Sequence, residues 1–289
     1  MIIQGLFLYI YFFIYNQMKK LFFSSLLLGG LSLPAVVTAQ TSETVPYQYS
    51  HDEAPYVYLS ENAIQLLGNT GWDDDMVPFT LPFEFQYQGE SINSWIMDTY
   101  GGLYPNGFNL DQDVPGILGI YSDYMDNGNS SVNLEITGEE GSRIAKIEFR
   151  NVGFFSGEPE ADSANFQIWL YEGSNKIEYH VGPNNVNSLI LVPDGGILIV
   201  GLNYAIPDDS IYLHVVNYNE NTNTDTLLKF NLNEEEDPSE DFFNAIVYGS
   251  QFPQEGTVFR FEPTLSEDTV GIQPIPKLVG AISPNPTSD

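Results

Sequence analysis

Hydrophobic and polar residues alternate strictly along two neighbouring segments between Ala164 and Gly182. In each segment every second residue is large and apolar, and the break between them, residues 172–175, reads Glu-Gly-Ser-Asn. A period of two places alternate side chains on opposite faces of a strand, and Gly, Ser and Asn are common in tight turns. The pattern therefore predicts a β-hairpin whose first strand has Phe166, Ile168 and Leu170 on one face and Gln167, Trp169 and Tyr171 on the other.

The same period recurs along the rest of the chain, most clearly at 79–87, where five large apolar residues share one face. No segment has the pattern of an amphipathic helix of useful length, so no βαβ crossovers are expected. Residues 40–54 are expected to form a loose leading segment. These features predict an all-β fold, an antiparallel β-sandwich or jelly roll. The other strands are predicted at 55–59, 63–67, 92–97, 117–121, 132–136, 143–152, 189–192, 197–202, 211–216, 227–232, 245–248 and 258–261.

The N-terminal region has the layout of a secretory signal peptide. Two lysines follow Met18, an apolar run extends from Leu21 to Leu33, and small residues precede Gln40. A basic segment, an apolar segment and a small-residue cleavage site in this order are typical of export. We expect translation to start at Met18, residues 1–39 to be absent from the mature chain, and the protein to be secreted. The competing interpretation is a retained membrane helix, for which the apolar run before Asn16 is short.

The remainder divides by composition into a β-sandwich domain at 40–262, a Pro-rich linker at 263–282 and a short C-terminal segment at 283–289. This last segment reads Ser-Pro-Asn-Pro-Thr-Ser-Asp. It resembles the opening of the C-terminal sorting domain of the type IX secretion system of Bacteroidetes. The resemblance implies a truncated sorting domain, the type IX machinery as a partner and the outer-membrane surface as a destination.

Charge and cysteine content exclude several classes of function. The net charge is −30, and without Lys19 and Lys20 of the leader it is −32, with seven basic and 39 acidic residues. Such a field repels phosphate backbones, so nucleic acid is excluded as a partner. The chain has no cysteine, which excludes disulfides, thiolate metal sites and a cysteine nucleophile.

A segment rich in acids and amides at 123–129 suggests a calcium site. An EF-hand loop beginning there fails, because Met125 and Leu134 occupy its third and twelfth positions. A different calcium site, shared with 73–75 or with Asp111 and Asp113, is consistent with the preference of calcium for oxygen ligands. Ordinary turn chemistry is the alternative interpretation. The candidate calcium ligands are Asp123, Asp126, Asn127 and Asn129.

No catalytic motif is present, and no organic cofactor is expected. The three histidines, His51, His180 and His214, lie on separate segments, and His180 and His214 are predicted to be surface residues because they alternate outward in strands. A glycosidase needs two carboxylates across a cleft, for which Asp123 with Glu148 or Glu178 is the first pair to consider.

Trp169 and Tyr171 are the candidate ligand-binding residues. They lie on the hairpin face opposite Phe166, Ile168 and Leu170. If that face is exposed, their rings could stack on sugar rings or contact a partner protein. If a second sheet covers it, they belong to the core.

Several short sequence motifs between residues 79 and 182 occur in the same order as in the nidogen-like domain and its bacterial surface-protein relatives, which this region resembles. The chain departs from the family where Tyr121-Ser122 replaces the usual Trp before Asp123. The resemblance implies an extracellular, adhesion or matrix-type β module, without a defined ligand site. These motifs are the aromatic strand and turn at 83–89, Asn-Gly-Phe at 106–108, the apolar strand at 117–123, the strand that runs from Arg143 to Val152, and the hairpin at 165–172.

Together these observations predict a secreted or cell-surface, non-enzymatic protein that binds an extracellular protein or glycan in an adhesion-like role. The alternatives are a secreted hydrolase acting on polysaccharides and a structural coat component.

Overall fold

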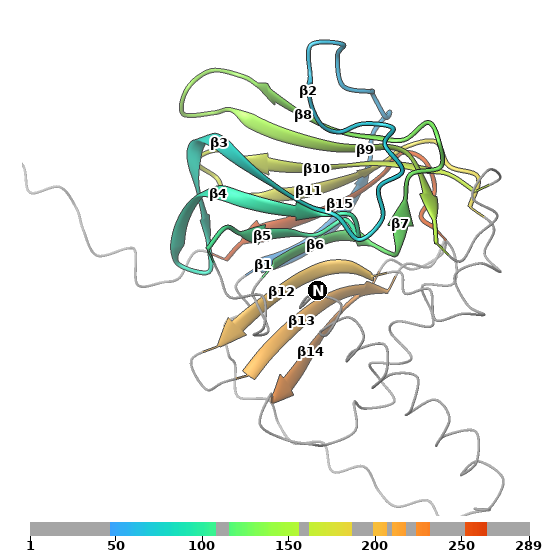
Figure 1. The fold of residues 1–289 in the computed structure, drawn as a ribbon. Coiled ribbons are helices and arrows are strands. Elements are labelled where there is room, and N and C mark those ends of the chain that lie inside the picture. The colour runs from blue at the N-terminus through green and yellow to red at the C-terminus, as the bar shows by residue number, and fades with distance from the viewer. Residues whose placement is uncertain are drawn as a thin grey trace, which may run out of the picture.

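The computed structural model describes residues 47–107, 116–155, 162–186, 199–206, 210–217, 224–231 and 252–264. In this part of the chain all regular structure is β, arranged as two antiparallel sheets that pack face to face (Figure 1). The predicted β-sandwich is therefore confirmed. Among these residues no helix has the length and apolarity to cross a membrane. The predicted signal peptide, most of the linker and the sorting segment lie outside the described residues.

Strand order places the hairpin near the middle of one sheet. The first sheet has the order β1 (Tyr47–Glu53), β15 (Thr257–Pro263), β11 (Ile177–Val181), β10 (Ala164–Tyr171), β9 (Ile144–Phe154), β8 (Ser131–Thr137) and β2 (Ile64–Leu67), and β7 (Tyr124–Met125) pairs with β9. The second has the order β14 (Thr224–Asn231), β13 (Ser210–Asn217), β12 (Ile199–Ile206), β6 (Gly116–Tyr121), β5 (Leu103–Pro105), β4 (Glu90–Asp98) and β3 (Met76–Tyr87).

The predicted hairpin is β10 and β11. Its register pairs Phe166 with Val181 and Leu170 with Ile177. Gly173 and Asn175 in the turn have positive φ angles of 77° and 54°, which glycine and asparagine tolerate best. Local alternation and turn chemistry were sufficient to predict this element.

Two predictions near the N-terminal end of the sandwich were wrong. Residues 47–53, expected to be loose, form strand β1, because they pair along their whole length with β15 from the other end of the domain. Residues 55–59, expected to be a strand, join no ladder and instead cross the outer face of the first sheet. The strands predicted at 189–192 and 245–248 lie outside the described residues.

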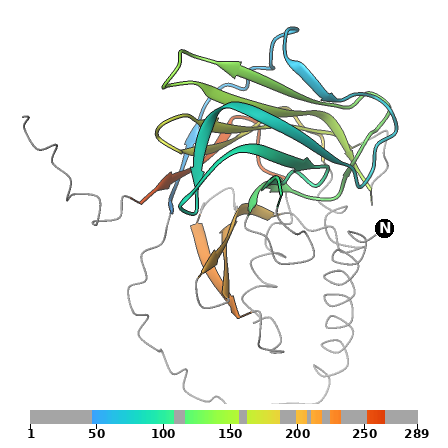
Figure 2. The same cartoon turned by 60° about the vertical axis from the view of Figure 1, so that its left-hand side comes forward.

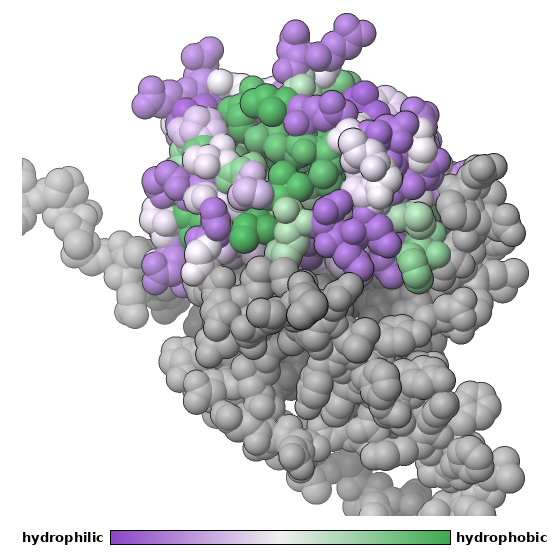
Figure 3. Space-filling model, in the orientation of Figure 1, coloured by the Kyte–Doolittle hydropathy of each residue, from purple (hydrophilic) through white to green (hydrophobic). Residues whose placement is uncertain are grey.

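The core lies between the sheets (Figure 2). Phe149 and Phe166 stack there on neighbouring strands, with ring centroids 4.6 Å apart and planes 8° apart. Partly buried Leu66 and Val77 of the edge strands β2 and β3, and Ile136 of β8, pack against the same core. Figure 3 shows hydrophobic surface over β3, β8 and β9, bordered by polar residues. Edge strand β3 contains Pro78 and Pro82, which cannot donate to a ladder and so disfavour pairing with another chain.

A pair of glycines allows close approach within and between the sheets. Gly119 of β6 and Gly201 of β12 are cross-strand partners. A methyl group on Gly201 would lie 2.2 Å from the carbonyl oxygen of His214, and one on Gly119 would lie 2.5 Å from that of Gly101. The Gly201 carbonyl also accepts a hydrogen bond of 2.8 Å from the hydroxyl of Tyr179 in the opposite sheet. These two positions have no room for a side chain.

Candidate functional site

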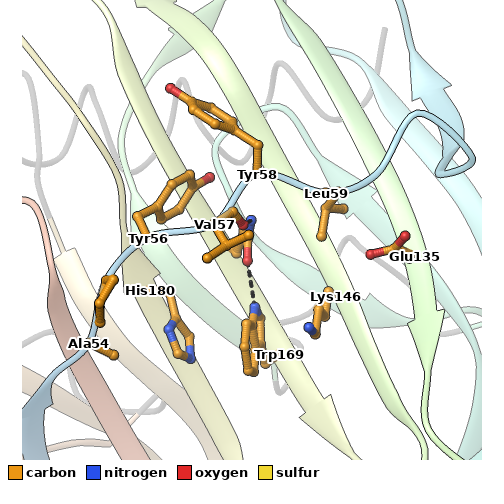
Figure 4. A pocket seen from close by; sticks show the side chains of 11 residues that line it. Ala54, Tyr56, Val57, Tyr58, Leu59, Glu135, Lys146, Trp169 and His180 are labelled. Atoms are coloured by element: carbon orange, nitrogen blue, oxygen red, sulfur yellow. Dashed lines mark hydrogen bonds between the residues drawn. The ribbon is translucent and has the colours of Figure 1, made fainter.

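A pocket of about 310 Å³ lies on the outer face of the first sheet, beneath residues 54–59, which we call the strap. The strap forms one wall, and side chains from β8 to β11 form the floor (Figure 4). The floor faces away from the second sheet, because inward positions on these strands are taken by the core. The side chains of the floor are Glu135, Lys146, Gln167, Trp169 and His180.

Glu148 of β9 holds the strap against the sheet. Its side chain is fully buried. Oε1 accepts hydrogen bonds from the Tyr56 hydroxyl at 3.0 Å, the Leu59 backbone N–H at 3.1 Å and Gln167 Nε2 at 2.7 Å. Oε2 accepts from Arg150 Nε at 2.7 Å, and Arg150 Nη2 donates to the Leu59 carbonyl at 3.1 Å. A buried carboxylate is stable only with partners of this kind, so Glu148 is the anchor of the strap.

The Tyr56 hydroxyl remains a donor in this arrangement. Burial, and then the charge of Glu148, raise the pKa of Tyr56 well above its usual value. Gln167 adds a second link, because its Nε2 also donates to the Val57 carbonyl at 2.9 Å. The strap is thus bound to the sheet by side chains, although it shares no ladder with it.

Trp169 lies between two neighbours on the adjacent strands (Figure 4). The His180 ring stacks on it at 3.8 Å between centroids, and Lys146 Nζ lies 4.0 Å from its ring centroid on the other side. Its Nε1 donates to Gln167 Oε1 at 2.7 Å. The ring is partly buried, covered by the strap and these neighbours rather than by a second sheet. The edge of the ring is therefore the part that faces the pocket, and stacking of any group on its face would require Lys146 or His180 to move.

Tyr171, the other candidate ligand residue, is not among the residues that line the pocket. Its hydroxyl donates to Glu178 Oε2 at 2.5 Å, and Lys176 Nζ lies 3.8 Å from its ring centroid. Although burial opposes it, hydrogen bonds from His180, Tyr171, Lys176 and Arg260 hold the pKa of Glu178 well below its usual range. Glu178 is consequently the centre of a charged network beside the pocket.

Two of the three histidines are buried, so the prediction of surface histidines was wrong for them. His180 is 8% exposed, because it stacks on Trp169 under the strap. His214 is 1% exposed and faces inward, with its ring 5.3 Å from that of Phe261. His51 is exposed.

The structure brings Asp123 together with Asp73 and Asp74. One carboxylate oxygen from each lies within 4.8 Å of the others. Burial, and then repulsion from Asp73 and Asp74, raise the pKa of Asp123 to about 7. The Tyr100 hydroxyl donates to Asp74. Residues 73–75 are one of the two partner segments predicted for Asp123 from the sequence, and Asp111 and Asp113 lie outside the described residues.

The other candidate calcium ligands form hydrogen bonds within their own turn. Asp126 Oδ2 accepts from the Gly71 N–H at 2.7 Å, and Oδ1 accepts from the Gly128 N–H at 2.8 Å. Asn127 Oδ1 accepts from the Asn129 N–H at 3.1 Å. These contacts fasten the turn before β8 to the loop before β3. Of the four residues, only Asp123 lies in the acidic cluster with Asp73 and Asp74.

Stability should fall as pH rises through neutrality because two aspartates have raised pKa values. Burial raises the pKa of Asp98 to about 6, against opposing hydrogen bonds, and that of Asp123 reaches about 7. Both carboxyl groups bind a proton more tightly in the folded state than in the unfolded state. Their contribution to the free energy of unfolding is therefore complete below pH 4, and it is lost as the pH rises through 6 to 7. We expect the Tm to decrease between pH 5 and 8, and to decrease less in Asp123→Asn than in Asp75→Asn. Equal slopes in thermal melts of the two variants would contradict this.

The carboxylates considered for a hydrolase do not face one another. Glu148 and Glu178 are engaged by the strap and by the charged network. Asp123 lies beside the C-terminal end of β9, away from Glu148 in the middle of that strand, and its carbonyl accepts from the Phe155 N–H at 3.0 Å. The geometry of the described residues therefore gives no support to a catalytic pair of Asp123 with either Glu148 or Glu178.

Lys146 and Gln167 line the pocket and were not predicted as site residues from the sequence. The alternation that places Trp169 outward also places Gln167 outward, and the alternation along 143–152 does the same for Lys146. The missing information was the register between strands, which sets Lys146 directly opposite Trp169.

Comparison with protein families identifies the fold. A family model described as NIDO related matches residues 46–263, well over half of the chain. The chain belongs to the NIDO-related family. The match extends the resemblance noted at 79–182 to the whole sandwich, from β1 to β15. Neither a search of the curated proteins nor a search of the solved structures found a match.

Proposed function

We propose that this NIDO-related chain is a secreted or cell-surface binding module without enzymatic activity, which takes an extracellular protein or glycan through the pocket beneath the strap. The family match supports an extracellular type of β domain. The observation that carries the proposal is the pocket itself, in which an aromatic edge, an amide and charged groups converge under a fixed wall.

The pocket suits one small unit of a larger ligand. Its volume of about 310 Å³ is at the lower end of the range for small-molecule sites. One sugar ring or one side chain fills such a space. The walls combine the apolar edge of Trp169 with the charged groups of Lys146 and Glu135. Sugars complement this combination, since their C–H faces are apolar and their hydroxyls are donors and acceptors.

We propose export by the signal peptide at 18–39, followed by passage to the outer cell surface through the type IX machinery. The support is the order of segments at 18–40 and the sorting-domain phrase at 283–289. N-terminal sequencing of the exported protein tests the first step, with Gln40 expected as the first residue.

Binding should depend on Trp169. We expect Trp169→Ala to weaken binding of a glycan identified on an array at least tenfold, since the variant removes the central side chain of the pocket. Isothermal titration measures the affinity, and thermal melts report whether the variant is folded. Tyr171→Phe is the matched control, because it removes a hydroxyl outside the pocket and should leave the affinity unchanged. The proposal is wrong if the array and a screen of extracellular proteins give no binding partner, or if Trp169→Ala binds normally.

The calcium hypothesis now rests on Asp123 with Asp73 and Asp74. Three carboxylates with oxygens within 4.8 Å of one another provide the ligand type that calcium prefers. Calcium at millimolar concentration is then expected to raise the Tm of the wild-type protein and not that of Asp123→Asn. An equal response of both proteins would show that the effect is general screening of charge.

A further inference from the structure

Basic side chains gather on the face that carries the pocket. The chain has nine Lys and Arg against 39 acidic residues. The structure describes five of these basic side chains, and four of them project from the outer face of the first sheet. They lie on β9, on β15 and at the start of β11, around Trp169. The four are Lys146, Arg150, Lys176 and Arg260.

Three of these four have carboxylate partners. Arg150 pairs with Glu148 at 2.5 Å, Lys176 with Glu178 at 2.9 Å, and Arg260 with Glu178 at 2.7 Å. For Lys146 the described residues provide no ion pair and no hydrogen bond, and its ammonium group lies over the ring of Trp169. Its ammonium group is thus the cation of this face that is not already neutralised by a carboxylate in contact with it.

Lys146 is also the cation that lines the pocket. The side chain is partly buried, and this burial lowers the pKa of Lys146, against the opposing influence of Glu135. A partly desolvated ammonium group gains more from an anionic partner than an exposed one does, because water screens the attraction less. The pocket therefore favours a ligand that brings a negative charge to Lys146.

We propose that the pocket takes a sugar unit that carries a carboxylate, of the uronic acid type, with the carboxylate beside Lys146 and the ring against the edge of Trp169. This inference rests on the proposed function and names its ligand class.

The second charged group of the floor distinguishes an acidic sugar from other anions. Glu135 is the cross-strand partner of Lys146 and lines the same pocket. Its carboxylate repels a ligand that offers only negative charge, such as an acidic peptide side chain. A sugar acid also has hydroxyl groups, which can donate to Glu135 while its own carboxylate accepts from Lys146. A neutral sugar leaves the ammonium group without a partner.

The test uses the mature chain and trimers of galacturonate, glucuronate and mannuronate, each compared with its methyl ester. The ester keeps the sugar ring and removes the charge. In calorimetric titrations we expect at least one acid trimer to bind tenfold or more tightly than its ester. Lys146→Met should abolish this preference, and Lys146→Arg should retain it.

Lys176→Met is the matched control. It removes the same charge from the same face, and its ammonium group also lies over an aromatic ring, but it is paired with Glu178 and does not line the pocket. We expect it to keep the preference for the acid. Thermal melts of all variants separate loss of binding from loss of folding.

Each remaining outcome counts against the inference in a distinct way. Equal affinity for acid and ester, with binding still dependent on Trp169, overturns the ligand class and leaves the proposed function standing. Trp169-dependent binding of polyglutamate without binding of any uronate assigns the pocket to an acidic peptide instead. Failure of every saccharide and protein overturns both proposals.

Discussion

Glu148→Ala is expected to lower the free energy of unfolding by about 3–5 kcal/mol, because three donors under the strap lose their acceptor and each buried donor left unsatisfied costs about 1–3 kcal/mol. The variant removes the acceptor for Tyr56, the Leu59 N–H and Gln167, and it leaves Arg150 without its carboxylate. Unpaired donors under the strap then carry a desolvation penalty that nothing offsets. Urea denaturation followed by circular dichroism measures the difference.

The same variant should release the strap. Tyr56 and Tyr58 are chymotrypsin sites within it, so limited digestion should cut Glu148→Ala in this segment faster than the wild-type protein. Glu148→Gln keeps the shape and one acceptor oxygen, and an intermediate loss is expected. Glu61→Ala, an exposed acid just beyond the strap, is the control and should change stability by less than about 0.5 kcal/mol. A loss below about 1 kcal/mol in Glu148→Ala, with unchanged digestion, would mean that Glu148 does not anchor the strap.

Gly201→Ala is expected to lower the free energy of unfolding by about 3 kcal/mol, the upper part of the range for overpacking a core. The new methyl group would lie 2.2 Å from the His214 carbonyl oxygen, which belongs to the backbone of the neighbouring strand. No side-chain rotation relieves that contact, so β12 and β13 must separate. Because Gly201 is also the acceptor of the Tyr179 hydroxyl, the shift reaches the opposite sheet.

Gly89→Ala is the matched control for this variant. Gly89 has a φ angle of 80° but open space around its Cα, so its substitution tests backbone strain without a clash. Gly89→Ala is expected to lower the free energy of unfolding by about 1–2 kcal/mol. Thermal melts of both variants give the comparison, and a Gly201→Ala protein that melts with the wild type would refute the close-packing argument.

The strap shows why local patterns misassigned part of the chain. Residues 55–59 alternate like a strand, yet they join no ladder because Glu148 and Arg150 take the hydrogen bonds of Leu59. Residues 47–53 have a polar pattern, yet they form a strand because β15 supplies a partner along their whole length. In both cases the deciding partner is distant in sequence, and a window of neighbouring residues contains no information about it.

The acidic cluster illustrates the same limit at a candidate site. Asp123 and the segment 73–75 were both recognisable from composition, but their convergence depends on how the loops before β3 and before β7 meet. Asp126 and Asn127 lie next to Asp123 in sequence, and their oxygens are nevertheless used by the turn. Nearness along the chain was therefore a poor guide to which residues share a cluster.

The sequence by itself determined that this protein is all-β, because period-two alternation and turn residues are local properties that act within a few residues. Its family was indicated separately, by the short motifs between residues 79 and 182 that resemble the nidogen-like domain. It also determined which side chains of the hairpin share a face. Only the tertiary structure decided what covers the outward face, because the strap, Lys146 and His180 reach Trp169 through strand register and a buried carboxylate. Those long-range contacts turn one strand of a predicted hairpin into the floor of a pocket.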